Sequence, residues 1–131
     1  MSMSVFDIAG SAMRAQTVRL NTVASNLANA DTVAGSADEA YRSRQPVFQA
    51  LLDDGVGGVT ARGIVESSRE PAKRHQPEHP MADEEGYVYG SNVDTIEEMT
   101  NMMSASQSYR SNVELLNTLR QLELRTLKLA E

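Results

Sequence analysis

Apolar side chains recur every seven residues near the start of the chain, which is the spacing of one face of a helix. The first line comprises Phe6, Met13, Leu20 and Leu27, and the second comprises Ala9, Gln16, Val23 and Ala30. Two such lines make the narrow seam of a coiled coil, with Gln16 as its one polar member. Ser4 and Asp7 have the spacing of a capping box. The pattern therefore predicts a helix over residues 4–30, roughly 40 Å long.

A longer helical pattern occupies the other end, because residues 94–130 contain neither glycine nor proline. Asp94 and Glu97 form a second capping-box start. On a helical wheel the late leucines cover an arc of roughly 160°, and they are Leu115, Leu116, Leu119, Leu122, Leu127 and Leu129. Leu124 lies on the far side of the helix. One partner helix is too narrow to cover such an arc, so we expect other subunits to cover part of it.

The middle of the chain has a different character, since residues 31–90 hold seven of the eight glycines and all four prolines. Residues 47–52 and 59–65 predict two short strands, and the glycine-rich residues 55–58 predict the turn between them. Pro46 is expected to interrupt the first strand. Pro71, Pro77 and Pro80 predict an extended, irregular segment, and residues 87–89 fit one more short strand.

The pattern as a whole predicts a mainly α chain with three parts. Residues 1–30 and 91–131 supply the N-terminal and C-terminal helices of a coiled-coil core, and residues 31–90 supply a small β-hairpin with extended loops. Only 40% of the 131 residues are hydrophobic and 5% are aromatic, so the chain alone can build only a thin core. We therefore expect the helical ends to be mobile before assembly and to gain order from partners.

Charge and composition exclude several functions. The net charge of −6 argues against nucleic-acid binding, which needs a clustered basic face. The absence of cysteine rules out disulfides and thiolate sites. No segment approaches the ~18 consecutive apolar residues of a membrane span, so no membrane insertion is expected. Residues 1–12 lack the basic start and apolar run of a cleaved signal peptide.

Candidate chemistry is sparse. His75 and His79 are four residues apart, but Pro77 and Pro80 forbid the helix that would bring them onto one metal ion. Residues 83–85, three consecutive acidic side chains, read as a solvated turn rather than a paired-carboxylate site. Residues 55–58 lack the Lys-Ser/Thr of a phosphate loop, and no serine lies in a nucleophile elbow. We therefore expect no catalytic site, no cofactor and no metal.

Three segments resemble one protein family, the axial proteins of the bacterial flagellar rod and hook. The first is residues 24–32, Ala-Ser-Asn-Leu-Ala-Asn-Ala-Asp-Thr. The second is residues 79–88, His-Pro-Met-Ala-Asp-Glu-Glu-Gly-Tyr-Val, and the third is residues 92–99, Asn-Val-Asp-Thr-Ile-Glu-Glu-Met, continuing through residues 104–114. The last two are similar to a short proximal-rod member. The chain departs from the family pattern at Ser91, at residues 76–78 and at residues 72–73.

The resemblance implies a structural subunit of the basal-body rod, the shaft that transmits motor torque. It implies export through the flagellar type III apparatus without a cleaved signal, and a position in the rod across the periplasm. Expected partners are other rod proteins, further copies of this chain and, during secretion, the export apparatus. The alternatives are another proximal-rod subunit of the same family and a soluble helical adaptor resembling an export chaperone, which would be stably folded in isolation.

The expected assembly interface combines the first seam with apolar positions of the C-terminal helix. Three methionines early in that helix suit an adaptable contact surface, although such spacing is equally typical of ordinary core packing. The predicted interface residues are Phe6, Met13, Leu20, Leu27, Met99, Met102, Tyr109, Val113, Leu116, Leu119, Leu122 and Leu127.

Overall fold

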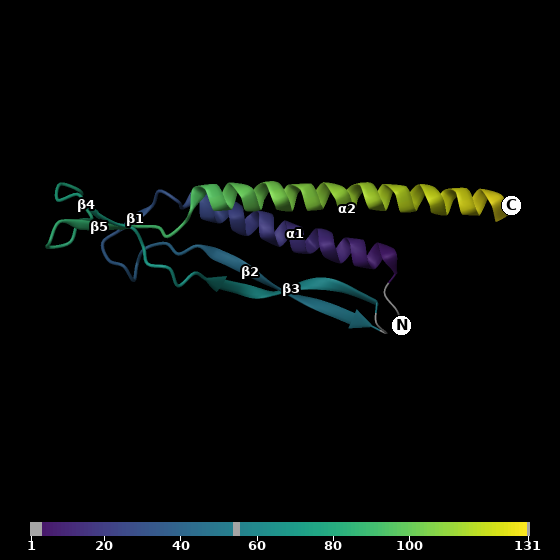
Figure 1. Ribbon diagram of the computed structural model, residues 1–131, viewed down its shortest axis with the longest axis horizontal. Helices are drawn as coiled ribbons and strands as arrows, with labels where there is room; N and C mark the ends of the chain where they lie inside the picture. Colours follow the sequence, from purple (N-terminus) through teal and green to yellow (C-terminus); the bar gives the residue numbers. More distant parts are fainter. Residues whose placement is uncertain (1–3, 54–55, 131) are drawn as a thin grey trace.

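The computed structural model describes residues 4–53 and 56–130, which form two long helices and two small β-sheets (Figure 1). Helix α1 (Val5–Ala28) has 24 residues and helix α2 (Thr95–Ala130) has 36. The two helices run antiparallel, and α2 continues past the first residues of α1 (Figure 1). The two terminal helices are therefore confirmed, close to their predicted ends.

The helix starts follow the predicted caps with one difference. The Ser4 hydroxyl accepts the Asp7 backbone N–H at 3.1 Å, and the Asp7 carboxylate accepts the Ser4 N–H at 3.2 Å, which completes a capping box. At α2, Asp94 accepts the backbone N–H of Glu97 at 3.2 Å. The Glu97 carboxylate instead accepts a hydrogen bond from Arg69 at 3.3 Å. Glu97, which the sequence pattern assigned to the cap of α2, therefore links the start of α2 to Arg69 between β3 and β4.

The hairpin is longer than the sequence pattern indicated. Strand β2 (Arg44–Asp53) pairs antiparallel with strand β3 (Val56–Glu66), with Ala50 opposite Val59. Pro46 does not interrupt β2, because a two-stranded sheet leaves one edge of each strand without a ladder partner. Gly57 and Gly58 lie inside β3, so the predicted turn is wrong at these positions, and residue 55 falls outside the described residues.

A second sheet, with strand order β1-β5-β4, occupies the end of the molecule away from the chain termini (Figure 1). It contains β1 (Val33–Ala34), β4 (Lys73–His75) and β5 (Tyr87–Gly90). The strand predicted at residues 87–89 is confirmed. The segment predicted to be irregular instead supplies β4, which pairs with β5 although prolines flank it. Strands this short give almost no periodic signal, which is why β1 and β4 were missed.

Helix α1 lies between α2 and the β2–β3 hairpin, so both of its sides are covered (Figure 1). The buried apolar residues are small: Ala9, Ala15, Val23, Ala34, Ala40, Val88 and Ala105. Small side chains let the elements approach closely but bury little area each. The core is accordingly thin, as the composition predicted, and many larger apolar side chains remain exposed.

Candidate assembly surface

One side of α2 packs against α1 along a regular seam. The seam positions alternate in steps of three and four, and they are buried or half-buried: Glu98, Met102, Ala105, Tyr109, Asn112, Leu116 and Leu119. Contacts along this side include a hydrogen bond from Arg19 to Asn101 at 3.3 Å. Met13 and Tyr109 line a hollow of about 550 Å³ between the two helices. This side of α2 is therefore occupied within the chain.

Beyond Leu119 the seam loses its apolar character. Its next two positions are Glu123 and Thr126, and every residue from 120 to 130 is exposed. The tail of α2, defined here as residues 120–130, nevertheless carries four leucines. Leu122 and Leu124 are each 51% exposed, Leu127 is 59% exposed and Leu129 is 87% exposed. No described part of the chain covers them, so the tail offers an apolar surface to another molecule.

A second uncovered face lies near the start of α2. Ile96, Met99 and Met103 follow helical spacing and are 78%, 54% and 74% exposed. On a helix these positions point away from the seam that contains Glu98 and Ala105. We call this the methionine face. It and the tail lie at opposite ends of α2, about 40 Å apart at 1.5 Å per residue.

The predicted interface residues divide into two groups. Half-buried within the chain are Met13, Leu20, Leu27, Met102, Tyr109, Val113, Leu116 and Leu119. Exposed are Phe6, Met99, Leu122 and Leu127. The first group already contributes to packing inside the subunit, whereas the second is free to contact a neighbour. A role of either group in assembly stays a prediction.

The sequence reading assigned no role to a buried polar cluster at the junction of the helices and the sheets. Its four central residues are Asn26 at the end of α1, Ser43 just before β2, Asn92 between β5 and α2, and Glu98 in α2. Asn26, Ser43 and Glu98 are each 0% exposed. Three of the four lie inside the segments that resemble rod proteins. Only Glu98 gave a signal in the sequence, as a charged residue at a seam position of α2.

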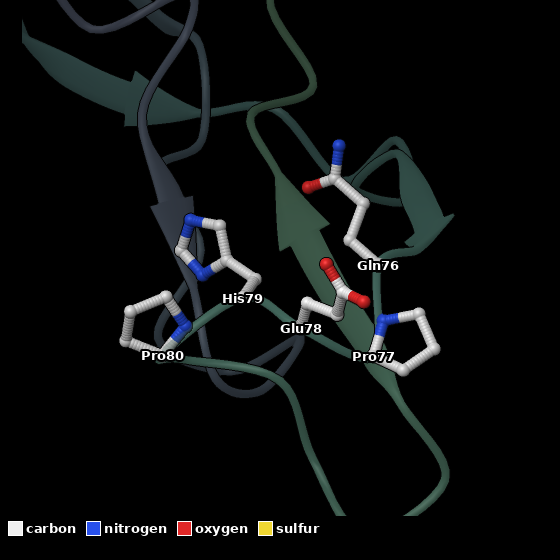
Figure 2. Close-up of a pocket in the computed structure, with 5 residues that line it drawn as sticks. All are labelled: Gln76, Pro77, Glu78, His79 and Pro80. Carbon is white, nitrogen blue, oxygen red and sulfur yellow. The ribbon is translucent and has the colours of Figure 1, made fainter.

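The hollow drawn in Figure 2 is the outer side of one loop and not an enclosed site. It has a volume of about 610 Å³ and is lined by five consecutive residues, Gln76, Pro77, Glu78, His79 and Pro80. The His79 Nδ1 accepts the backbone N–H of Met81 at 3.0 Å. The His75 ring packs edge-on against Tyr87, with centroids 4.8 Å apart. Each histidine thus has a separate local contact.

The acidic run at residues 83–85 forms the turn that leads into β5. Asp83 accepts the backbone N–H groups of Tyr87 at 2.8 Å and Glu85 at 3.0 Å. The bond from Tyr87, more than that from Glu85, holds the pKa of the Asp83 carboxyl below its ordinary value. Gly86 follows with a φ of 83°, a conformation that favours glycine. This cluster shapes a turn, as the sequence indicated.

Within residues 4–53 and 56–130, no group of three or more histidine and acidic side chains is arranged to hold a metal ion. No helix in that part of the chain combines the length and the hydropathy that crossing a membrane requires.

Comparison with known proteins identifies the family. Residues 6–35 match the family model described as flagella basal body rod protein, and residues 84–129 match the model described as flagellar basal body rod FlgEFG protein C-terminal. These two matches cover α1 and α2 and leave out the hairpin.

Similar proteins extend the match over nearly the whole chain. The flagellar basal-body rod protein FlgC of Escherichia coli O6:H1 is 48% identical, with 98% of each chain covered. FlgC of Salmonella typhimurium is 47% identical over the same shares, and FlgC of Buchnera aphidicola from Acyrthosiphon pisum is 37% identical, also over 98% of each chain. Identity at this level over the full length, hairpin included, is far above what a shared fold alone requires. The chain therefore belongs to the FlgC family of flagellar basal-body rod proteins.

Proposed function

We propose that this structural subunit of the basal-body rod is held to its neighbours by two exposed apolar regions of α2, the tail, whose leucines point to more than one side, and the methionine face. The observation that carries the proposal is the tail. Its four leucines are at least half exposed, and the N-terminal end of α1 does not reach far enough along α2 to cover them. The exposed part of a leucine adds nothing to the subunit's own fold, whereas covering it with a neighbour stabilises the contact by on the order of 1 kcal/mol for a half-exposed side chain.

The positions of the two faces favour an open assembly. A surface that pairs with itself about a two-fold axis gives a closed dimer, whereas two different surfaces that pair head to tail give a ring or a helical filament. Leu122 and Met99 lie at opposite ends of one straight helix. A neighbour on each face therefore extends the array in both directions, as a shaft requires.

Within this proposal, residues 1–30 and 91–131 form the helical core of the subunit, and residues 31–90 form its β part. The half-buried interface residues hold α1 to α2, and the exposed ones join subunits in a coiled-coil layer. Close packing of long helices resists torsion because each helix has many contacts along its length. No catalysis is needed for this role, and the subunit acts by position alone.

We infer further that the chain reaches the rod through the flagellar export apparatus, without a cleaved signal, and resides where the rod crosses the periplasm. Support comes from its family and from its thin core. A subunit whose apolar faces stay uncovered until arrival is suited to passage as an unfolded chain. Its proposed partners are other rod proteins, further copies of itself and, in transit, the export apparatus.

The tail provides the test. Leu122→Asp replaces an apolar side chain of the proposed contact with a charge, which is costly to bury against a neighbour. We expect the variant to be made and exported but to yield no rods and no swimming in soft agar. Gln121→Asp is the matched control, because it adds the same charge at the adjacent exposed residue outside the leucine arc. This control should swim and build rods.

Two readouts separate the outcomes. Rods are recovered from basal-body preparations, and export is followed by detecting the chain outside the cytoplasm. If Leu122→Asp builds rods as well as Gln121→Asp, the tail is not an assembly surface. If the variant accumulates in the cytoplasm, the substitution acts on export, and the assembly role of the tail is not supported.

A further inference from the structure

We propose that the buried polar cluster around Ser43 is a latch, a conformational device that seats the β2–β3 hairpin against the two helices and makes the order of three distant segments interdependent. The segments are the end of α1, residues 41–45 and the start of α2. They are joined through side chains rather than through a sheet or a common helix.

The first half of the latch is Asn26. Its side-chain amide donates to the Arg44 carbonyl at 2.8 Å and accepts the Arg44 N–H at 2.9 Å. It also accepts the Tyr41 hydroxyl at 2.8 Å and donates to the Ser43 hydroxyl at 3.3 Å. All four hydrogen-bonding positions of the amide are thus used. Asn26 binds the extended segment as an adjacent strand would, although it belongs to a helix.

The second half is Asn92, which approaches the same segment from the chain that leads into α2. Its side-chain oxygen accepts the Ser43 backbone N–H at 2.6 Å, and its amide nitrogen donates to the Arg69 carbonyl at 2.8 Å. The backbone on both sides of Ser43 is therefore clamped by two asparagines that are 66 positions apart in the sequence, at 26 and 92.

Glu98 makes the latch conditional. One of its carboxylate oxygens accepts from Gln45 at 3.1 Å and from the Ser43 hydroxyl at 3.4 Å. The other is buried and has no hydrogen-bond partner among the described residues. A buried carboxylate that loses its few donors is strongly unfavourable. If residues 41–45 are only partly in place, the Glu98 carboxylate stays buried but loses hydrogen bonds. This arrangement therefore has a higher free energy than either the fully docked or the fully released one.

The consequence is cooperative behaviour. Because the first two residues of β2, Arg44 and Gln45, belong to the clamped segment, the latch also sets the direction in which the hairpin leaves the helices. A latch of this kind specifies one arrangement and adds little net stability, since buried polar networks recover little more than the desolvation they require. It lets a chain with a thin core switch between a released and a seated state without intermediates.

Hydrogen exchange resolved by residue, measured by NMR on the full chain, tests the latch. Glu98→Leu keeps the approximate size of the side chain and removes the carboxylate that accepts from Gln45 and Ser43. It contacts neither the Ser43 N–H nor the Arg44 N–H, which are held by Asn92 and Asn26. If the latch is cooperative, exchange at these two amides and in the last turn of α1 should accelerate together, by about tenfold or more. Glu114→Leu makes the same change at an exposed position of α2 that lies away from the latch. It is the control and should leave these amides unchanged.

Ser43→Ala serves as the second variant, because it deletes only the central hydroxyl and keeps the backbone N–H that Asn92 accepts. It should accelerate exchange in the same three segments. Acceleration confined to the neighbours of the substituted residue would overturn the proposal. So would a uniform acceleration that includes the far part of the hairpin, around the Ala50–Val59 pair, because that pattern indicates a general loss of stability.

Discussion

Helix α2 has two halves that differ in what their apolar residues do. From Glu98 to Leu119 a seam of residues in steps of three and four is buried or half-buried against α1. From 120 to 130 every residue is exposed, although leucine is more frequent there than in the paired half. A single uninterrupted helix thus contains one surface used for folding and another left for a neighbour.

The difference shows that apolar content does not identify the core of this chain. The paired half combines larger apolar side chains such as Tyr109 and Leu116 with small or polar ones such as Ala105 and Asn112, at which the two helices can approach closely. The leucines of the tail would be a liability in an isolated subunit, and they become useful only when a partner covers them. Three predictions test this division, beginning with the largest expected effect.

Substituting a leucine by aspartate in each half should separate folding from assembly. Leu116→Asp puts a charge beside α1 and should lower the free energy of unfolding by roughly 2–5 kcal/mol. Leu122→Asp changes an exposed residue and should lower it by less than about 0.5 kcal/mol. Urea denaturation followed by circular dichroism measures both. Equal losses would mean that the tail is covered in the free subunit and would contradict the division.

Limited trypsin digestion should find the boundary between the halves. Arg120 and Arg125 lie in the exposed tail, whereas Arg19 is half-buried and donates to Asn101. We expect cleavage at the two tail sites to be at least about tenfold faster than cleavage at Arg19, because helix ends without tertiary contacts open readily. The sequence alone predicted mobility at both ends, so equal rates would favour that simpler expectation over the asymmetry that the structure indicates.

A matched pair of glutamines gives the smallest and most local contrast. Gln107 and Gln121 are both exposed, in the paired half and in the tail respectively. Gln107→Gly should lower the free energy of unfolding by about 1 kcal/mol, the usual effect of glycine inside a helix. Gln121→Gly should lower it by no more than a few tenths of a kcal/mol, because the tail opens independently of the rest. Identical losses would show that α2 unfolds as one unit.

Both terminal helices could be predicted from the chain because long, glycine-free segments with regular apolar spacing have few alternatives. The Ser4–Asp7 capping box was read correctly for the same reason, since it depends on residues three positions apart. The exclusion of disulfides and the argument against nucleic-acid binding likewise needed no structure, because they rest on the absence of cysteine and on the net charge. The family resemblance lay mostly in the helical segments and the loops beside them, which the family models also match.

The β region was harder to predict for equally physical reasons. Pro46 and the glycines of residues 55–58 are typical of interruptions, yet Pro46, Gly57 and Gly58 lie in paired strands, because a two-stranded hairpin tolerates residues that a wider sheet excludes. Strand β4, with only three residues, is stabilised by its partner β5 and by the contact of His75 with Tyr87. Pairing between distant segments is not encoded in local spacing.

The sequence alone was sufficient for features that depend on residues close together in the chain. These are two amphipathic helices, their starting caps and an arc of leucines too wide for one partner helix to cover. Only the tertiary structure decided which leucines pack against α1 and which remain exposed, because that depends on how far the N-terminal end of α1 reaches along α2. It also decided that Asn26, Ser43, Asn92 and Glu98 meet. Their hydrogen bonds join positions up to 55 residues apart, as between Ser43 and Glu98, and no local pattern relates them. A buried polar contact is specified by geometry in three dimensions.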